Sequence, residues 1–336
     1  MVDTQQRVSR LARAVFCLMR LLGLKHWLAK RAPFRESAAR PQKQRAQGLR
    51  LYGLRLHGLR VVRLDVGGFP LYLLSAGAAA PDKAVFFIHG GGFVMPPLPL
   101  HWHTATMLAR RTGAAVYFVR YPLFPEAGLA QIYDHVAAAF DAARRDFGGR
   151  LQAVWGDSAG ATLALSLASR LAPDVQPGRF IALSPCADAS FSNPDAEARR
   201  DLDLLLPWDT VKTTAQRMLL SVKNEDVSPL FFSYENLRRS GARLTLCIGG
   251  RDILYPDTER LHRRLLAEGI AHDYWYREDM IHVWPYMPLV PESRADMRRI
   301  LRLLRSDGAG RTMDNGQWRA ARPGDAGKSD SEQIGQ

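Results

Sequence analysis

The feature that most constrains this chain is an alternation between short β-rich runs and segments with helical periodicity. The runs occupy 84–89, 115–120, 151–156, 180–184, 244–249 and 272–277, and helices are expected near 102–111, 129–147, 159–171, 257–267 and 294–304. Most of the runs are apolar throughout, which is typical of strands covered by helices on both faces. The alternation therefore predicts an α/β fold with a mostly parallel, doubly wound sheet.

Three other regions complete the predicted organisation of the 336 residues. Residues 49–74 are apolar and punctuated by glycines, which predicts an antiparallel portion at the start of a main domain that spans 49–305. The alternation lapses between Pro185 and Arg243, which predicts a cap insertion at about 185–240. Residues 306–336 are too poor in apolar groups to fold alone, so we expect a disordered tail.

The formal net charge of +13 is concentrated at one end of the chain. Residues 1–63 hold 15 basic and two acidic side chains, and the remaining residues hold equal numbers of each sign. The body therefore has no basic excess with which to bind nucleic acid. The three cysteines form no CxxC pair, so we expect neither a disulfide framework nor a zinc site, and a reducing, cytoplasmic location. Separately, we expect no metal or organic cofactor.

Residues 1–48 form a basic amphipathic segment that we expect to be part of the cap. Apolar residues recur there at helical spacing, with arginines on another face: Leu11, Val15, Leu18, Met19 and Leu22, against Arg10, Arg13 and Arg20. Two interpretations stay open: a helix that packs on the body, or a peripheral contact of residues 8–30 with an anionic membrane at its inner surface. No run of the chain is long and apolar enough to predict a spanning helix.

The segment GDSAG (156–160) falls between a predicted strand and a predicted helix. A tight strand-to-helix turn forces its central residue into a strained backbone and lifts the Ser158 hydroxyl above the sheet. The placement, rather than the five letters alone, predicts that Ser158 is a nucleophile. An ordinary glycine-rich turn is the alternative.

The segment HGGGF (89–93) follows another predicted strand. Consecutive glycines allow backbone N–H groups to converge on one point, as an oxyanion hole requires. We expect the donors to be the N–H groups of Gly90 and Gly91, joined by that of Ala159 after the nucleophile. A phosphate-binding loop is disfavoured because no Lys-Ser/Thr pair follows the glycines.

Asp252 and His282 follow the last two predicted strands. Serine, then acid, then histidine is the order expected of a catalytic triad laid on such a sheet. A serine needs an imidazole to accept its proton, and the imidazole needs a carboxylate to fix its tautomer. We therefore expect Asp252 and His282 to complete a triad with Ser158.

HGGGF, GDSAG, the RDILY segment (251–255) and the MIHVW segment (280–284) together resemble the hormone-sensitive-lipase-like branch of the α/β-hydrolase superfamily, a group of carboxylesterases. The resemblance covers about residues 49–305 and implies an α/β-hydrolase fold with a helical cap. It also implies the same triad and oxyanion hole. Tyr121–Glu126 matches the group's corresponding stretch less fully, with Pro122 and Phe124 in place of the usual arginine and alanine, so Glu126 is given no catalytic role.

The expected substrate is a small-molecule ester with a short or medium acyl chain, or a lactone. Apolar candidates to line its pocket are Phe93, Trp102, Trp155, Trp208 and Trp284. Two alternatives remain: a non-catalytic small-molecule-binding protein on the same fold, and a membrane-associated lipase acting on longer chains. A homodimer is left open.

Overall fold

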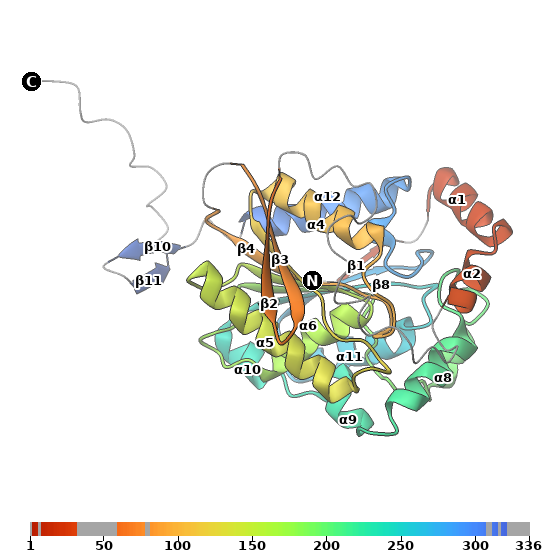
Figure 1. Ribbon diagram of the computed structural model, residues 1–336. Helices are drawn as coiled ribbons and strands as arrows, with labels where there is room; N and C mark the ends of the chain where they lie inside the picture. Colours follow the sequence, from red (N-terminus) through yellow and green to blue (C-terminus); the bar gives the residue numbers. More distant parts are fainter. Residues whose placement is uncertain are drawn as a thin grey trace, which may run out of the picture.

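A nine-stranded sheet forms the centre of the molecule (Figure 1). The computed structural model describes residues 2–5, 8–31, 59–77, 81–306, 311–314 and 317–320. The strands of the sheet are β1 (Val2–Gln5), β2 (Leu59–Val66), β3 (Phe69–Ala76), β4 (Ala84–Ile88), β5 (Ala115–Val119), β6 (Ala153–Asp157), β7 (Arg179–Leu183), β8 (Arg243–Gly249) and β9 (His272–Arg277). Their order is β1-β9-β8-β7-β6-β4-β5-β3-β2. The predicted antiparallel start is confirmed, because β3 pairs antiparallel with both β2 and β5 while the later strands pair parallel.

Helices cover both faces of this sheet, as the apolar strands predict. They are α1 (Arg10–Leu21), α2 (Leu24–Arg31), α4 (Pro99–Thr112), α5 (Leu129–Phe147), α6 (Ala159–Arg170), α7 (Pro194–Glu197), α8 (Trp208–Met218), α9 (Asn224–Val227), α10 (Glu235–Ser240), α11 (Tyr255–Ala267) and α12 (Pro291–Ser306), with short 3₁₀ turns η1 (Pro229–Phe231) and η2 (Trp284–Tyr286). Helices α4 and α12 pack on one face, and α5, α6 and α11 pack on the other (Figure 1).

Neighbouring residues of one strand point into two different cores. In β6, Val154 belongs to the core beneath α5 and α6, and Trp155 belongs to the core beneath α4 and α12. Every residue of β4, β5, β6 and β7 is buried. Each large apolar side chain buried in this way contributes roughly 1.5–3 kcal/mol. The strand ends, and the loops that follow them, are therefore held on a rigid frame.

Two small elements were not predicted. Strand β1 pairs parallel with β9 at the sheet edge, through backbone hydrogen bonds that need no apolar pattern. Within 306–336, where we expect a disordered tail, β10 (Arg311–Asp314) pairs antiparallel with β11 (Gln317–Ala320). The intervening Asn-Gly is a strong hairpin-turn signal in the sequence. Of the predicted antiparallel region 49–74, residues 51–58 lie outside the described chain.

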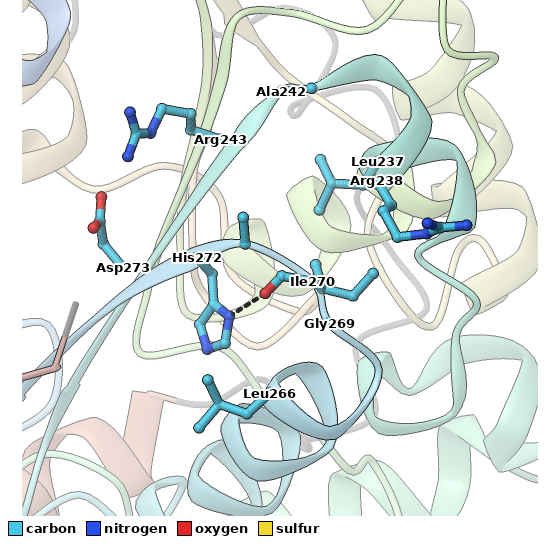
Figure 2. Close-up of a pocket in the computed structure, with 11 residues that line it drawn as sticks. Leu237, Arg238, Ala242, Arg243, Leu266, Gly269, Ile270, His272 and Asp273 are labelled. Carbon is cyan, nitrogen blue, oxygen red and sulfur yellow. Dashed lines mark hydrogen bonds between the residues drawn. The ribbon is translucent and has the colours of Figure 1, made fainter.

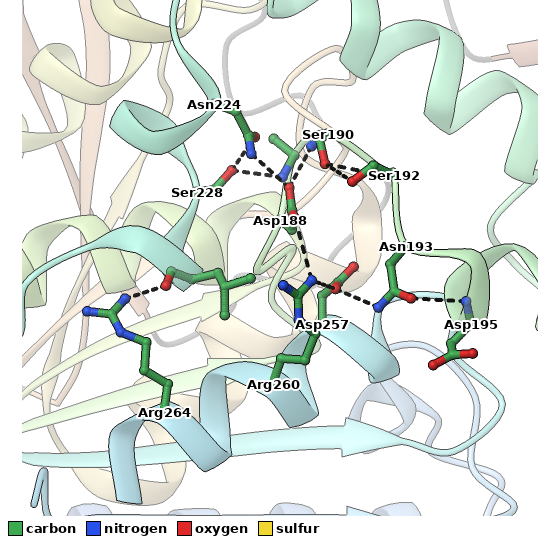
Figure 3. A network of polar contacts seen from close by, with 12 residues as sticks. Asp188, Ser190, Ser192, Asn193, Asp195, Asn224, Ser228, Asp257, Arg260 and Arg264 are labelled. Atoms are coloured by element: carbon green, nitrogen blue, oxygen red, sulfur yellow. Dashed lines mark hydrogen bonds and ion pairs between the residues drawn. The ribbon is translucent and has the colours of Figure 1, made fainter. Parts of the chain in front are cut away.

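The insertion between β7 and β8, residues 184–242, carries α7, α8, α9, η1 and α10, and we call it the cap segment. A polar network ties its two ends to the main domain (Figure 3). Asp188 accepts hydrogen bonds from Asn224 at 2.9 Å and from the Ser190 N–H at 2.9 Å. Arg260 on α11 lies 3.9 Å from Asp188 and 2.9 Å from Asp257. These contacts fix the cap segment relative to α11.

The N-terminal helices contact both the main domain and the cap segment. Ser9 caps α1 by accepting from the Ala12 N–H at 3.1 Å, and its hydroxyl donates to Glu292 at the start of α12 at 3.2 Å. Lys25 on α2 donates to the Asp203 carbonyl at 3.1 Å. Within the described ranges, no helix is long and apolar enough to cross a bilayer.

Candidate active site

The three predicted triad residues follow the carboxyl ends of strands in the parallel part of the sheet. Ser158 follows β6, Asp252 follows β8, and His282 follows β9. Strands β6 and β8 are separated only by β7, and β9 is the next strand beyond β8. This is the edge at which doubly wound sheets place their ligands, because the loops there leave the sheet together.

Ser158 occupies a strained backbone conformation between β6 and α6. Its φ is +51° and its ψ is −124°, a combination that a residue with a side chain rarely adopts. The turn is tight enough that a Cβ at Gly160 would lie 2.2 Å from the Ile88 carbonyl oxygen, so only glycine fits there. The predicted strand-turn-helix geometry is therefore present at GDSAG.

Asp252 and His282 are brought together although 30 residues separate them. The His282 Nδ1 lies 2.7 Å from the Asp252 Oδ2, and both side chains are buried. The other oxygen of Asp252 accepts from the Leu254 N–H at 2.9 Å. Backbone bonds join the two loops, from Gly250 N to the Arg277 carbonyl at 2.8 Å and from Arg251 N to the Met280 carbonyl at 3.0 Å. The imidazole is thus oriented by a carboxylate that is itself held in place.

The environment of His282 moves its pKa above the ordinary value of 6.5. Burial acts to lower this pKa, but the charge and hydrogen bond of Asp252 oppose burial and prevail, with further contributions from Asp203 and Asp157. The carboxylate therefore stabilises the imidazolium, which is the form that a base reaches after accepting a proton.

A short segment after β7 connects the loops that carry Ser158 and His282. The Ser158 N–H donates to the Leu183 carbonyl at 2.8 Å, and the Val283 N–H donates to the Ser184 hydroxyl at 3.0 Å. Residues 183 and 184 are consecutive, so the backbones beside the serine and the histidine share one support.

The glycine loop lies directly against the serine turn. A Cβ at Gly90 would lie 2.3 Å from an Asp157 carboxylate oxygen and 3.1 Å from the Ser158 Cβ. The N–H groups of Gly90, Gly91 and Ala159 make no hydrogen bond to any residue that the structure describes. They are available as donors beside Ser158.

Two side chains fix the direction of those glycine N–H groups. Tyr121 donates from its hydroxyl to the His89 carbonyl at 2.8 Å, and the His89 Nδ1 lies 2.6 Å from the Gly90 carbonyl oxygen. In a trans peptide the N–H points opposite to the C=O, so anchoring the two carbonyls orients the N–H of Gly90 and of Gly91. Burial, with the nearby His101, lowers the pKa of His89 well below its ordinary value, so a neutral ring donates this bond.

Asp157, the residue before the serine, is held by hydrogen bonds to two other side chains. It accepts from the Tyr286 hydroxyl at 3.1 Å, and its other oxygen lies 3.1 Å from the His101 Nε2. The remaining ring nitrogen of His101 accepts from the Leu98 N–H, so the Nε2 carries the proton. Among the described residues no group of His, Cys, Asp and Glu side chains is arranged to hold a metal ion.

Asp203 is a buried carboxylate beside the triad residues that the sequence analysis missed. Its Oδ2 accepts from the Ile253 N–H at 3.0 Å, and its Oδ1 accepts from Leu205 and Leu206. Burial, and then the charge of Asp252, raise its pKa to about 6. The only signal in the sequence is a single acid within an otherwise apolar LDLLLP stretch (202–207).

The aromatic residues predicted to line the pocket separate into two groups. Trp102, Trp155 and Trp284 are buried in the core beneath α4 and α12, where Trp102 stacks on Phe118 and Trp284 donates to Asp296 at 2.8 Å. A ring enclosed in that core has no surface to offer a substrate. Phe93, in the glycine loop, and Trp208, at the start of α8, belong to the other core, on the side of the cap segment, and are also buried, at 7% and 3% exposed.

A cavity of about 510 Å³ lies away from this site (Figure 2). It is lined by residues at the amino ends of β8 and β9, including Arg243 and His272, together with Leu237 and Leu266 from neighbouring helices. Asp252 and His282 follow the carboxyl ends of the same strands. The cavity is thus at the opposite edge of the sheet.

A mostly parallel sheet with a serine, a histidine and an aspartate at the carboxyl ends of its strands is typical of one class of enzyme. Comparison with known proteins identifies the same class. Residues 85–286 match a family model described as the alpha/beta hydrolase fold, and the chain belongs to that family. It is a carboxylic ester hydrolase. The predicted membership in the hormone-sensitive-lipase-like branch is confirmed by its relatives.

Three of these relatives show the extent of the likeness. The chain is 26% identical to an esterase of Acinetobacter venetianus over 65% of this chain and 74% of that protein. It is 28% identical to the carboxylesterase/phospholipase LipF of Mycobacterium tuberculosis over 68% of this chain and 64% of that protein. A solved esterase from the bacterial hormone-sensitive lipase family is 25% identical, with a TM-score of 0.69 over 90% of this chain and 99% of that one.

Proposed function

We propose that this ester hydrolase acts through a serine nucleophile and an acyl-enzyme, with Ser158, His282 and Asp252 as its triad. The observation that carries the proposal is the 2.7 Å contact between His282 and a buried Asp252, at the same edge of the sheet as a serine in a strained turn. The Ser158 oxygen attacks the ester carbonyl while His282 accepts the hydroxyl proton. His282 then gives that proton to the leaving alcohol, and water resolves the acyl-enzyme by the same route.

The developing oxyanion would be stabilised by the N–H groups of Gly90, Gly91 and Ala159. These donors lie beside the serine, and none of them is satisfied by another described residue. Donors that are oriented before the reaction cost no reorganisation when charge develops. Tyr121 and His89 act as positioning residues, because each anchors one carbonyl of the loop.

Tyr121→Phe is expected to lower kcat by about 5- to 10-fold, the effect of losing one oriented hydrogen bond. KM should change little, since the ground-state carbonyl gains less from these donors than the oxyanion does. Steady-state kinetics on a nitrophenyl ester measure this split. Tyr117→Phe is the matched control, because its hydroxyl bonds instead to Asp146 on α5 at 2.6 Å. An equal loss in both variants would contradict the positioning role.

We propose small neutral esters with short or medium acyl chains, or lactones, as substrates. Phe93, at the end of the glycine loop that lies against Ser158, supports an apolar acyl site on the side of the cap segment. The names of the relatives, an esterase and a carboxylesterase/phospholipase among them, agree with an ester of this general class. The cap segment, with α1 and α2 beside it, would cover the site.

A series of nitrophenyl esters from acetate to laurate tests the substrate class. We expect kcat/KM to be highest below about ten carbons and to fall beyond, because each methylene that the acyl site cannot bury forfeits binding. Ser158→Ala supplies the background rate. A maximum with laurate would instead favour a lipase acting on longer chains.

A further inference from the structure

Only part of the apolar face of α1 packs against the main domain. Ala12 and Phe16 are buried against the core beneath α4 and α12. Leu11 is 50% exposed, Leu18 is 54% exposed and Leu22, just past the helix end, is 72% exposed. Positions 11, 18 and 22 are seven and four residues apart, so they form one stripe along the helix. This stripe is left open to solvent.

We propose that this leucine stripe docks the protein on an anionic membrane surface. A helix lying in the headgroup region needs exposed apolar side chains beside cationic ones. Both are present on α1, and the Phe16 ring of this helix lies 5.9 Å from the guanidinium of Arg251, the residue before Asp252. The substrate would then be an ester with a short or medium acyl chain that partitions into the membrane surface, an extension that rests on the proposed function.

Charge favours an anionic lipid surface over any other occupant. Residues 8–31 carry six Lys or Arg side chains and no acidic one, while the chain beyond residue 63 is balanced. Arg10 and Arg13 make no ion pair with any residue in the described ranges. Each cation near an anionic leaflet adds to the attraction. Two copies of this chain meeting through α1 would instead bring like charges together without acidic partners.

The position of the helix fits a role in substrate delivery. Arg20 donates to the Asp201 carbonyl at 3.3 Å and Lys25 donates to the Asp203 carbonyl, so the end of α1 and α2 rest on the cap segment. Asp203 in turn accepts from the Ile253 N–H, next to Asp252. Leu202, between Asp201 and Asp203 in the sequence, is 46% exposed. Helices α1 and α2 stand together at one side of the molecule (Figure 1).

The test is co-sedimentation of the full chain with vesicles of phosphatidylglycerol and phosphatidylcholine, compared with vesicles of phosphatidylcholine alone. The wild-type chain should bind the anionic vesicles preferentially, and added salt should weaken that binding. Leu18→Gln with Leu22→Gln, the leucine-stripe variant, should weaken it about tenfold, because two exposed leucines no longer leave water when the helix docks. Arg10→Gln with Arg13→Gln should weaken it at least about tenfold.

Leu220→Gln with Leu266→Gln is the matched control, since these leucines are also exposed, at 86% and 56%, and lie on the cap segment and on α11 rather than on α1 or α12. It should bind as the wild type does. Circular dichroism checks that each variant is folded. Equal binding by the leucine-stripe variant, or no binding by the wild type, would overturn the proposal. So would a wild-type dimer in light scattering that this variant dissociates, because a second copy would then cover the stripe.

Two further measurements separate this proposal from the proposed function. Ser158→Ala should bind vesicles as the wild type does, whether or not Ser158 is the nucleophile. The leucine-stripe variant should hydrolyse a water-soluble nitrophenyl ester at the wild-type rate but be about tenfold slower on an ester embedded in anionic vesicles. Equal loss on both substrates would contradict a docking role.

Discussion

Ser158→Ala is expected to lower kcat on a nitrophenyl acyl ester by a factor of about 10⁴ to 10⁶. The variant removes the only atom proposed to form the acyl-enzyme, and His282 has no alternative hydroxyl to activate at that turn. The fold should be unaffected, because the Ser158 backbone already holds the strained φ of +51° and alanine adds no atom. Thermal unfolding therefore should give the same Tm within error, while the initial rate falls to the background.

Ser166→Ala is the matched control for that prediction. Ser166 is also buried and lies on the same helix α6, but it is two turns beyond the strained turn. It should keep wild-type kcat. A phosphonylating serine reagent should label the wild type and Ser166→Ala, but not Ser158→Ala, as read by intact mass. Turnover or labelling retained by Ser158→Ala would show that another residue is the nucleophile.

The frame of the molecule follows from local sequence because its strands are buried on both faces. An uninterrupted apolar run such as Ala84–Ile88 has few alternatives to a central strand, and β4 occupies these residues. Helix α5 likewise coincides with the predicted 129–147, since its apolar residues keep a strict helical period. Because parallel strands end at the same edge of the sheet, the loops that follow them lie close together. The motifs around Ser158, Asp252 and His282 therefore predict one site from their places after these strands.

The direction of large side chains does not follow from the sequence in the same way. Trp155 is an apolar residue directly before GDSAG and was a candidate to line the pocket, yet successive residues of a strand point to opposite faces. Trp155 points into the core beneath α4 and α12, where its indole donates to the Tyr286 hydroxyl at 2.8 Å. Asp203 was missed for a related reason, because it acts across 50 residues through a backbone N–H that has no sequence signature.

Asp252→Asn is expected to lower kcat by about 10⁴-fold while leaving the volume of the side chain unchanged. The amide can offer an N–H to the His282 Nδ1, which favours the imidazole tautomer that cannot accept the serine proton at the other nitrogen. It also removes the charge that stabilises the imidazolium. Steady-state rates on the same nitrophenyl ester measure the loss, and Asp279→Asn is the matched control. Asp279 lies three residues before His282 but pairs with Arg251 at 3.1 Å, so its loss should change the rate less than about threefold.

The pH dependence of kcat/KM shows whether Asp252 orients His282 or has only a structural role. In the wild type the pKa of His282 is raised, so kcat/KM should fall as the pH drops through a midpoint above 6.5, where the base becomes protonated. Without Asp252, burial becomes the dominant effect and lowers that pKa. The residual kcat/KM should therefore fall at a lower pH than in the wild type. A structural role would lower the rate or the Tm without moving the midpoint. An unchanged midpoint in Asp252→Asn, alongside a shifted one in Asp279→Asn, would transfer the orienting role to Asp279.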